Sequence, residues 1–391
     1  MIPYTSFLYF GVSLYVLLPS LLIGWVKKLS RFWIVIATMG MLVVQYAVPQ
    51  KILSNISVSD IWLVVGYVVF EWLVAGWFLL IRQRGVHRLI FYSAIFLGLL
   101  PLLGGKFIPL FNIPYGLTFL GLSYVTFRSL DVIIGIQDGL IHSLPPIQYL
   151  TFLLFFPTIS SGPIDRYNRF AEDWKKNRTG AEFLQDLDSA VHHIFTGFLY
   201  KFILAVLIKQ YWLDPSAQGM QFLPIFSYMY AYTLYLFFDF AGYSAFAVGF
   251  SYLLGIHTPE NFNRPFLSRN IRDFWNRWHI SLSWWFRDHI YSRFVVAALK
   301  GHWFKDKYVA SYLGFLITFG LMGLWHGTAW YYLLYGLYHG VLLSVSDMLS
   351  RWNKRVKIWG EGFWWQAASI FITVNLISFG MLIFSGRLAI K

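Results

Sequence analysis

The longest uncharged stretch of this chain, from Tyr308 to Ser346, is too long to cross a membrane as one helix. Its 39 residues contain no Lys, Arg, Asp or Glu. A single helix of that length would measure about 58 Å, whereas the hydrocarbon core of a bilayer is about 30 Å thick. The stretch is therefore predicted to form two helical segments joined by a break. Gly327 and Thr328, which directly follow His326, are the expected position of that break.

Two histidines, His326 and His339, are the only titratable groups of this stretch apart from its tyrosines. A group that titrates near neutral pH inside an apolar run is a candidate for proton transfer within a membrane. His326 adjoins the predicted break, where side chains and freed backbone groups can line a cavity. The alternative is a histidine that is hydrogen-bonded to another helix. His339 has no break beside it and is expected to be structural.

Apolar runs recur along the whole chain, which is 58% hydrophobic and only 13% charged. Soluble globular proteins carry roughly 25% charged residues. The pattern predicts an all-α polytopic membrane protein with about eleven transmembrane helices. Because no Pro/Ser/Gly-rich linker divides it, residues 1–391 are read as a single membrane-embedded domain. Within it we distinguish N-terminal spans (1–116), a core (117–350) and a C-terminal loop with the last span (351–391).

The basic residues, which give a net charge of +13, gather in short loops between the apolar runs. The first four runs cover residues 6–26, 32–48, 61–81 and 89–104. Basic residues follow the first and third of them, and the last run ends in Arg387 and Lys391. The positive-inside rule then predicts an N-terminus outside the cell and a cytoplasmic C-terminus. The chain has no Cys, so thiol catalysis and thiolate metal sites are excluded. No metal-binding set is recognisable, and no metal is expected.

Several charged groups interrupt the apolar segments after residue 117, where a lipid-exposed charge costs about 2.5–3.5 kcal/mol. Arg128 and Asp131 are three residues apart and are predicted to pair on one helix face. The segment FFPTISSGPIDRYNRF contains Ser161, Asp165 and Arg166 beside a Gly–Pro break. Such a break at membrane depth is tolerated where protein or water satisfies the backbone. The segment is thus either re-entrant, lining a cavity, or an ordinary interfacial turn.

Two further segments carry polar groups that could serve chemistry. In YLFFDFAGYS, Asp239 either hydrogen-bonds a neighbouring His or Arg or is a buried structural carboxylate. Residues 264–293 are rich in Trp and Arg and are predicted to be helical. Helical spacing would put Trp275, Asn276, His279 and Ser283 on or near one face. A histidine on such a helix is more often structural than catalytic.

The combination WNRWH (275–279) and, some 47 residues later, LWHG (324–327) in an apolar run resembles the membrane-bound O-acyltransferases. The segments SYVTFRSLD, FFPTISSGPIDRYNRF, FDFAGYSAFA and NFNRPFLSRNIRDFWNRWHISLSWWFRDH are similar to the branch of that family that D-alanylates teichoic acids. The resemblance runs from about residue 117 to the C-terminus, and before it the likeness lies mainly in hydropathy and length.

This resemblance implies a ring of transmembrane helices around a central funnel that opens to the outside, with short tilted helices inside. It implies His326 as the catalytic histidine and His279 as a second important one. A neutral imidazole suits acyl transfer to a hydroxyl, because it can accept the hydroxyl proton near pH 7 without a metal. We expect supporting or tunnel roles for residues near these motifs: Trp275, Asn276, Trp325, Ser161, Asp165, Arg166 and Asp239.

The resemblance also implies a partner, the acidic D-alanyl carrier protein, whose phosphopantetheine arm bears the D-alanyl thioester. No cofactor would be bound directly by the chain itself. The carrier is expected to dock on the cytoplasmic face at Val295, Val296, Lys300 and Lys305, and the acceptor outside would be teichoic acid or an intermediate. Basic side chains suit an acidic partner.

Two other functions stay open at this level. One is an O-acetyltransferase of an extracellular polysaccharide, which would share both histidines and use another donor. The other is a transporter that conducts an acyl donor or lipid without chemistry. The absence of a fixed-period sequence repeat argues against a transporter built from repeats.

Overall fold

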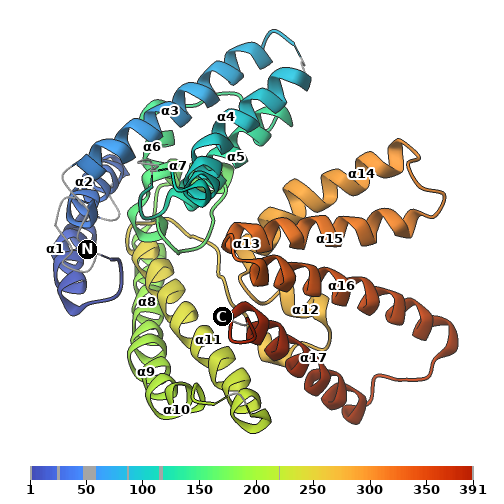
Figure 1. Cartoon of the computed structure of the whole chain (residues 1–391). Coiled ribbons are helices and arrows are strands. Elements are labelled where there is room, and N and C mark those ends of the chain that lie inside the picture. Colours follow the sequence, from blue (N-terminus) through green and yellow to red (C-terminus); the bar gives the residue numbers. More distant parts are fainter. Residues whose placement is uncertain are drawn as a thin grey trace. The chain divides into compact units, whose positions relative to one another are not determined.

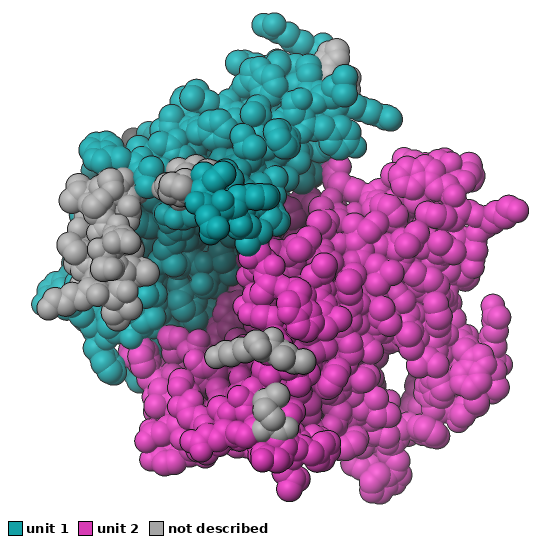
Figure 2. All heavy atoms as spheres, in the orientation of Figure 1, with its two compact units in different colours: residues 1–197, 243–259 teal, residues 198–242, 260–391 magenta. Residues whose placement is uncertain are grey.

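A computed structural model of the chain describes residues 2–23, 27–46, 59–85, 88–113, 118–219 and 221–389. Helices dominate these residues (Figure 1). The described part contains no named strand, only an isolated antiparallel bridge between Phe262 and Trp278. The predicted all-α class is confirmed. The chain divides into two compact units, residues 1–197 with 243–259 (unit 1) and residues 198–242 with 260–391 (unit 2) (Figure 2).

Unit 1 begins with four long helices and continues with shorter ones around buried loops. The apolar runs expected at 6–26, 32–48, 61–81 and 89–104 correspond to the first four helices. The helices are α1 (Phe7–Ile23), α2 (Lys27–Tyr46), α3 (Ser59–Arg82), α4 (Arg88–Phe107), α5 (Leu122–Gln137), α6 (Pro146–Leu154), α7 (Tyr167–Lys175) and α8 (Gly180–Phe198), with short 3-10 turns η1 (Ile108–Phe111) and η2 (Phe156–Thr158).

The segment that follows α8 stays helical, but it switches twice from the α-helical to the π-helical hydrogen-bond pattern. Two π-helical stretches, η3 (Leu199–Leu204) and η4 (Lys209–Leu213), alternate with α9 (Ala205–Ile208) and α10 (Asp214–Ser216). Such stretches are rare in helices and occur frequently at functional sites. The long helix α11 (Phe222–Leu253) then carries the chain from unit 2 back into unit 1.

Unit 2 also contains the two histidine motifs, on short helices and on a pair of long antiparallel ones. After the turn η5 (Pro265–Leu267), the elements are α12 (Ile271–Trp275), α13 (Ile280–Phe286), the π-helical η6 (Arg287–Tyr291), α14 (Ser292–Lys300), α15 (Lys307–His326), α16 (Trp330–Val356) and α17 (Phe363–Phe384). The predicted break in the uncharged stretch is confirmed, because α15 ends at His326 and α16 begins at Trp330.

Helices α15 and α16 approach closely where glycines replace side chains. A Cβ added to Gly336 would lie 2.1 Å from the carbonyl oxygen of Phe319, and one on Gly323 would lie 2.3 Å from that of Tyr332. Only a residue without a side chain fits at such a distance, as is common where helices pack without water between them. This contact sets the helix ends on either side of Gly327 and so positions His326.

Six helices in the described residues are long and apolar enough to cross a membrane. They comprise Ile61–Arg82, Arg88–Phe111, Gly180–Ser216, Phe222–Leu253, Lys307–His326 and Phe363–Phe384, and shorter apolar helices cover Phe7–Leu22 and Ser30–Tyr46. The chain is thus a multi-pass membrane protein. The number of eleven spans, the funnel and the single domain stay predictions.

The predicted pairing of Arg128 with Asp131 is wrong. Arg128 is fully buried in unit 1, and its guanidinium donates to the carbonyl oxygens of Phe152 (2.9 Å), Leu153 (3.1 Å) and Thr158 (2.8 Å). Asp131 instead accepts from Nη1 of Arg166 at 2.5 Å. The last residues of α6 and the turn η2 offer free carbonyl groups that a guanidinium fork satisfies better than a single carboxylate three residues away.

Candidate active site

His326 is the last residue of α15, and its imidazole is surrounded by aromatic rings of unit 2. The ring centroid of Trp325 lies 4.6 Å away, that of Phe384 4.9 Å away at 87°, and those of Tyr335 and Tyr332 at 6.2 and 6.4 Å. The side chain is partly exposed, unlike those of His279 and His339. These rings fix the orientation of the imidazole while leaving part of it accessible.

His279 comes from a sharp turn rather than from a helix face. It precedes α13 with φ 43° and ψ 53°, a left-handed conformation that costs a non-glycine residue roughly 1 kcal/mol. The residue is 4% exposed, and its Nδ1 is buried without a hydrogen-bond partner in the described part of the chain. The ring of Phe240 packs against it edge-on at 4.7 Å. Strain of this kind is retained where the surrounding structure enforces it.

The surrounding structure that enforces this turn is a strand-like segment centred on Asn261. The carbonyl of Asn261 accepts from the backbone N–H of Ile280 at 3.0 Å, and its side-chain Oδ1 accepts from the hydroxyl of Ser281 at 2.6 Å. Asn263 donates its backbone N–H to the carbonyl of Arg277 at 2.9 Å. Asn261 is completely buried. It was missed by the sequence reasoning because it lies outside the histidine motif, and only its place in NFNRPF hinted at it.

The two histidines of the motif interact electrostatically within unit 2. His326 ends a long apolar helix, and His279 occupies a turn that is braced from the other side by Phe240 of α11. A positive charge on His326 would oppose protonation of His279, because like charges repel. A histidine that stays neutral can accept a proton, which is what a general base must do.

The predicted helix face carrying Trp275, Asn276, His279 and Ser283 is wrong. Helix α12 ends at Trp275, Asn276 caps it with its backbone N–H on the carbonyl of Arg272, and the chain reverses before α13. Asn276 is exposed. Trp275 instead packs edge-on against Phe319 (4.9 Å) and His339 (5.1 Å). The chain does not continue as one helix here, because a continued helix would lose the backbone bridge between Phe262 and Trp278.

The remaining predicted residues of unit 2 have identifiable partners. Asp239 of α11 forms an ion pair with Lys201 of η3 at 2.5 Å, and its side chain is 37% exposed. In this contact the partner of Asp239 is a lysine, not the His or Arg that the sequence suggested. The carboxylate is also not fully buried. His339, expected to be structural, is completely buried in α16 against Tyr335 at 4.7 Å.

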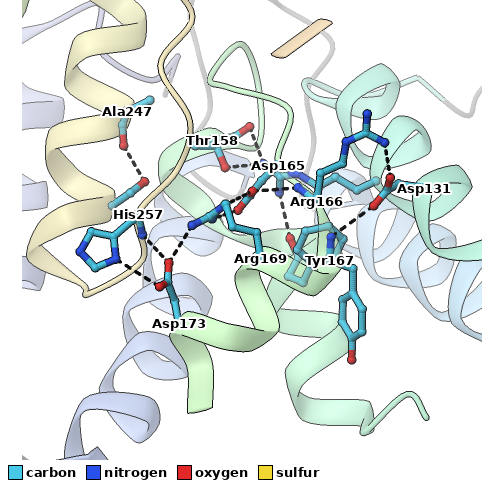
Figure 3. Close-up of polar contacts among 12 residues, drawn as sticks. Asp131, Thr158, Asp165, Arg166, Tyr167, Arg169, Asp173, Ala247 and His257 are labelled. Carbon is cyan, nitrogen blue, oxygen red and sulfur yellow. Dashed lines mark hydrogen bonds and ion pairs between the residues drawn. The ribbon is translucent and has the colours of Figure 1, made fainter. Parts of the chain in front are cut away.

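Ser161, Asp165 and Arg166 belong to unit 1, where Asp165 and Arg166 enter a chain of ion pairs (Figure 3). Asp165 pairs with Arg169, which also binds Asp173 at 2.7 Å. Neighbouring Ser160 shares a hydrogen bond with Tyr243. These contacts brace the buried loop, and its re-entrant character stays a prediction. The spacing of four residues between Asp165, Arg169 and Asp173 in the sequence is the signal that predicts these two pairs.

His257 joins the next two carboxylates of this chain of ion pairs. Its Nδ1 lies 3.1 Å from Asp173 and its Nε2 lies 2.7 Å from Asp186, which also accepts from Nη1 of Arg178 at 3.1 Å. A neutral imidazole has only one N–H, so two carboxylates favour the doubly protonated ring. The hydrogen bonds that the ring donates to Asp173, and then to Asp186, raise the pKa of His257 to about 9.

The expected carrier-docking residues lie on α14 and in the loop after it. Val296, Lys300 and Lys305 are exposed, whereas Val295 is partly covered by α15, because its side chain lies beside Gly314. Exposed apolar neighbours include Leu299 (44%) and Trp303 (57%). Helices α14 and α15 form a hairpin in unit 2, which we call the α14 hairpin. It thus presents an apolar patch edged by lysines.

Known proteins of one family match nearly the whole chain. Residues 91–386 match the profile of the membrane-bound O-acyltransferase family. The chain is 41% identical over 397 residues to the teichoic acid D-alanyltransferase of Bacillus subtilis (strain 168), covering 99% of this chain and 98% of that protein. It is 43% identical over 344 residues to the teichoic acid D-alanyltransferase of Lacticaseibacillus rhamnosus (83% and 84% covered). The probable alginate O-acetylase AlgI of Pseudomonas aeruginosa matches at 31% over 239 residues (59% and 43% covered).

Proposed function

This chain belongs to the membrane-bound O-acyltransferase family, and from that membership we propose that it transfers D-alanine to teichoic acid with His326 as the general base. The observation that carries the proposal is the match to a teichoic acid D-alanyltransferase along 99% of this chain. The site supports the chemistry, because unit 2 contains a partly exposed histidine and a second, buried one on which the first acts electrostatically. The transporter alternative is set aside, since the family is one of acyltransferases.

His326 performs the proton transfer in this proposal. It removes the proton of the acceptor hydroxyl while that oxygen attacks the D-alanyl thioester carbonyl. The carbon–sulfur bond then breaks, and the proton leaves with the thiolate as the free thiol. The thioester and the alcohol thus give an ester and a free thiol, and this reaction requires no redox partner or metal. General base catalysis of this kind contributes about 10²–10⁴-fold.

His279 orients the substrate or assists His326 in this proposal. Its own imidazole is buried, and burial in an apolar surrounding favours the uncharged ring. A positive charge on His326 would also oppose protonation of His279, because like charges repel. The rigid turn at His279, braced by Asn261, keeps this relationship constant during turnover.

The donor is expected to reach the site from the cytoplasm on the phosphopantetheine arm of an acidic carrier protein. Val296, Lys300 and Lys305 of the α14 hairpin suit that partner, since exposed apolar and basic groups complement an acidic surface. The acceptor hydroxyl would enter from outside. We place the N-terminus outside and the C-terminus in the cytoplasm, following the basic loops.

Acetyl transfer to a polysaccharide is the second candidate. The alginate O-acetylase match supports it, but this match covers 59% of the chain and 43% of that relative. The D-alanyltransferase matches extend across nearly whole chains, so D-alanyl transfer is preferred.

Reconstitution in proteoliposomes tests the proposal. D-alanyl-loaded carrier is supplied on one side, and labelled D-alanine is followed onto teichoic acid on the other. His326→Ala is expected to reduce transfer by about 10²-fold or more. His142→Ala serves as the matched control, because His142 is an exposed histidine in a loop of unit 1. Transfer by folded His326→Ala at near the control rate would sink the assignment of the base, and transfer of acetyl but not D-alanyl groups would sink the substrate.

A further inference from the structure

A small cavity in unit 1 lies away from both histidines of the proposed reaction. It has a volume of about 20 Å³, enough for one or two water-sized groups. Residues from α2, from the segment between α7 and α8, and from just after α11 line it: Arg31, Asp173, Lys176, Arg178, Leu254 and Gly255 among them. Three of these six are cations, and all belong to one compact unit.

Arg31 is held at the cavity by a single contact. Its Nε donates to the carbonyl oxygen of Trp174 at 2.5 Å. In the described part of the chain, this is the one protein acceptor that its guanidinium uses. A guanidinium carries five N–H donors in a planar fork. Most of the hydrogen-bonding capacity of Arg31 is therefore available to a group outside the protein.

Arg178 also has an unmet donor. Its side chain is 6% exposed, and its Nη1 donates to Asp186 at 3.1 Å and to the carbonyl of Tyr252 at 3.3 Å. Its Nη2 is buried and has no hydrogen-bond partner among the described residues. A Cβ on Gly255, at φ 76°, would lie 2.7 Å from Cζ of Arg178, so only glycine leaves room for this guanidinium. A buried charged donor without a partner is costly unless a ligand satisfies it.

The acidic residue of the lining does not neutralise these cations. Asp173 already binds Arg169 at 2.7 Å and the backbone N–H of His257 at 2.7 Å (Figure 3). Lys176 pairs with Glu182 at 2.8 Å, but both side chains are largely exposed. Arg31 remains as an uncompensated charge. The cavity is therefore suited to an anion.

The cavity lies at the ends of two apolar helices. Arg31 stands near the start of α2, directly before the apolar run, and Leu254 and Gly255 directly follow α11. Phe222–Leu253 is long and apolar enough to span a membrane. Basic side chains at such ends attract the anionic lipids of the cytoplasmic leaflet. A phosphate oxygen accepts charge-assisted hydrogen bonds from an arginine fork.

From these observations we propose that the cavity of unit 1 binds the phosphate of an anionic membrane lipid, with Arg31 and Arg178 as the donors. The bound headgroup ties α2 to the α7–α8 segment and to the end of α11. It is separate from acyl transfer, and its test does not depend on any turnover.

Native mass spectrometry and thermal unfolding of the purified full chain test this site. The probes are phosphatidylglycerol, phosphatidylcholine and inorganic phosphate, each added to delipidated protein. Wild type is expected to retain phosphatidylglycerol and to unfold at a higher temperature with it than with phosphatidylcholine. Arg31→Gln is expected to bind it about fivefold more weakly, the contribution of one basic side chain near an anionic surface.

Lys175→Gln is the matched control, because Lys175 is an exposed cation one residue before Lys176 and does not line the cavity. It should bind phosphatidylglycerol like wild type. Lys176→Gln provides a second variant if Arg31→Gln fails to fold, and a weaker affinity is expected there too. Equal loss in Lys175→Gln and Arg31→Gln would overturn the proposal, as would equal stabilisation by phosphatidylcholine. Stabilisation by inorganic phosphate alone would overturn the lipid as its source.

Discussion

His279 and His326 interact electrostatically although they are 47 residues apart in the sequence. One ends a long apolar helix, and the other occupies a left-handed turn. The pairing therefore depends on two backbone interruptions, the break at Gly327 and the turn before α13. Each backbone interruption can be tested separately from the histidine side chain next to it.

Replacing His279 with glycine separates its backbone role from its chemical role. Because φ is 43°, His279→Gly relieves a strained conformation of roughly 1 kcal/mol, whereas His279→Ala does not. We expect His279→Gly to unfold at a higher temperature than His279→Ala and both to lose most D-alanyl transfer. Thermal unfolding and proteoliposome transfer measure the two properties. Full activity in His279→Gly would contradict a role for the ring.

Gly336→Ala should destabilise unit 2 by about 1–3 kcal/mol, because its Cβ would collide with the carbonyl of Phe319. Thermal unfolding in detergent is the measurement. Gly40→Ala is the matched control, since that helical glycine has open space around its Cβ position. Equal unfolding temperatures for the two variants would show that α15 and α16 are not held by this contact.

The chain of ion pairs in unit 1 should weaken at high pH. The folded-state pKa of His257 is raised to about 9, so its contribution is complete below pH 6.5 and is lost as pH rises through 9. Asp173 and Asp186 contact its ring, and Arg169 and Arg178 pair with these two carboxylates. Unfolding temperature is expected to fall between pH 7 and 10 in wild type. His257→Gln should flatten that slope, and an unchanged slope would reject the assignment.

Removing the carboxylate of Asp239 should leave Lys201 of η3 without its ion pair. Since the side chain of Asp239 is 37% exposed, solvent screens the loss, and Asp239→Asn is expected to cost about 1 kcal/mol. The double variant Lys201→Met with Asp239→Asn should recover part of it. A double-mutant cycle by thermal unfolding measures the coupling, and strict additivity would mean that the pair contributes nothing.

Charge reversal on the α14 hairpin tests carrier docking. Lys300→Glu combined with Lys305→Glu is expected to raise the KM for the loaded carrier about tenfold at low salt, with kcat retained. The effect should shrink as salt rises, because exposed charges are screened. Arg84→Glu, an exposed charge reversal in unit 1, is the control. A lowered kcat with unchanged KM would place these lysines outside the docking surface.

The sequence by itself determined the all-α membrane class, the first four apolar helices and the break after His326. These features follow from the length of each apolar run and the charges at its ends, both of which can be read from consecutive residues. It also supplied both histidines, although only through resemblance were they joined as a pair. Run length cannot say which distant groups will meet.

Only the tertiary structure decided the partners of the charged groups and the turn at His279. Arg128 binds carbonyls at the end of α6 and in η2, and Asp131 binds Arg166, because buried donors and acceptors pair by proximity in space and not by helical spacing. The turn at His279 depends on Asn261, which is eighteen residues earlier and reaches it through backbone hydrogen bonds. Such contacts are set by the packing of whole helices, and no local pattern encodes them.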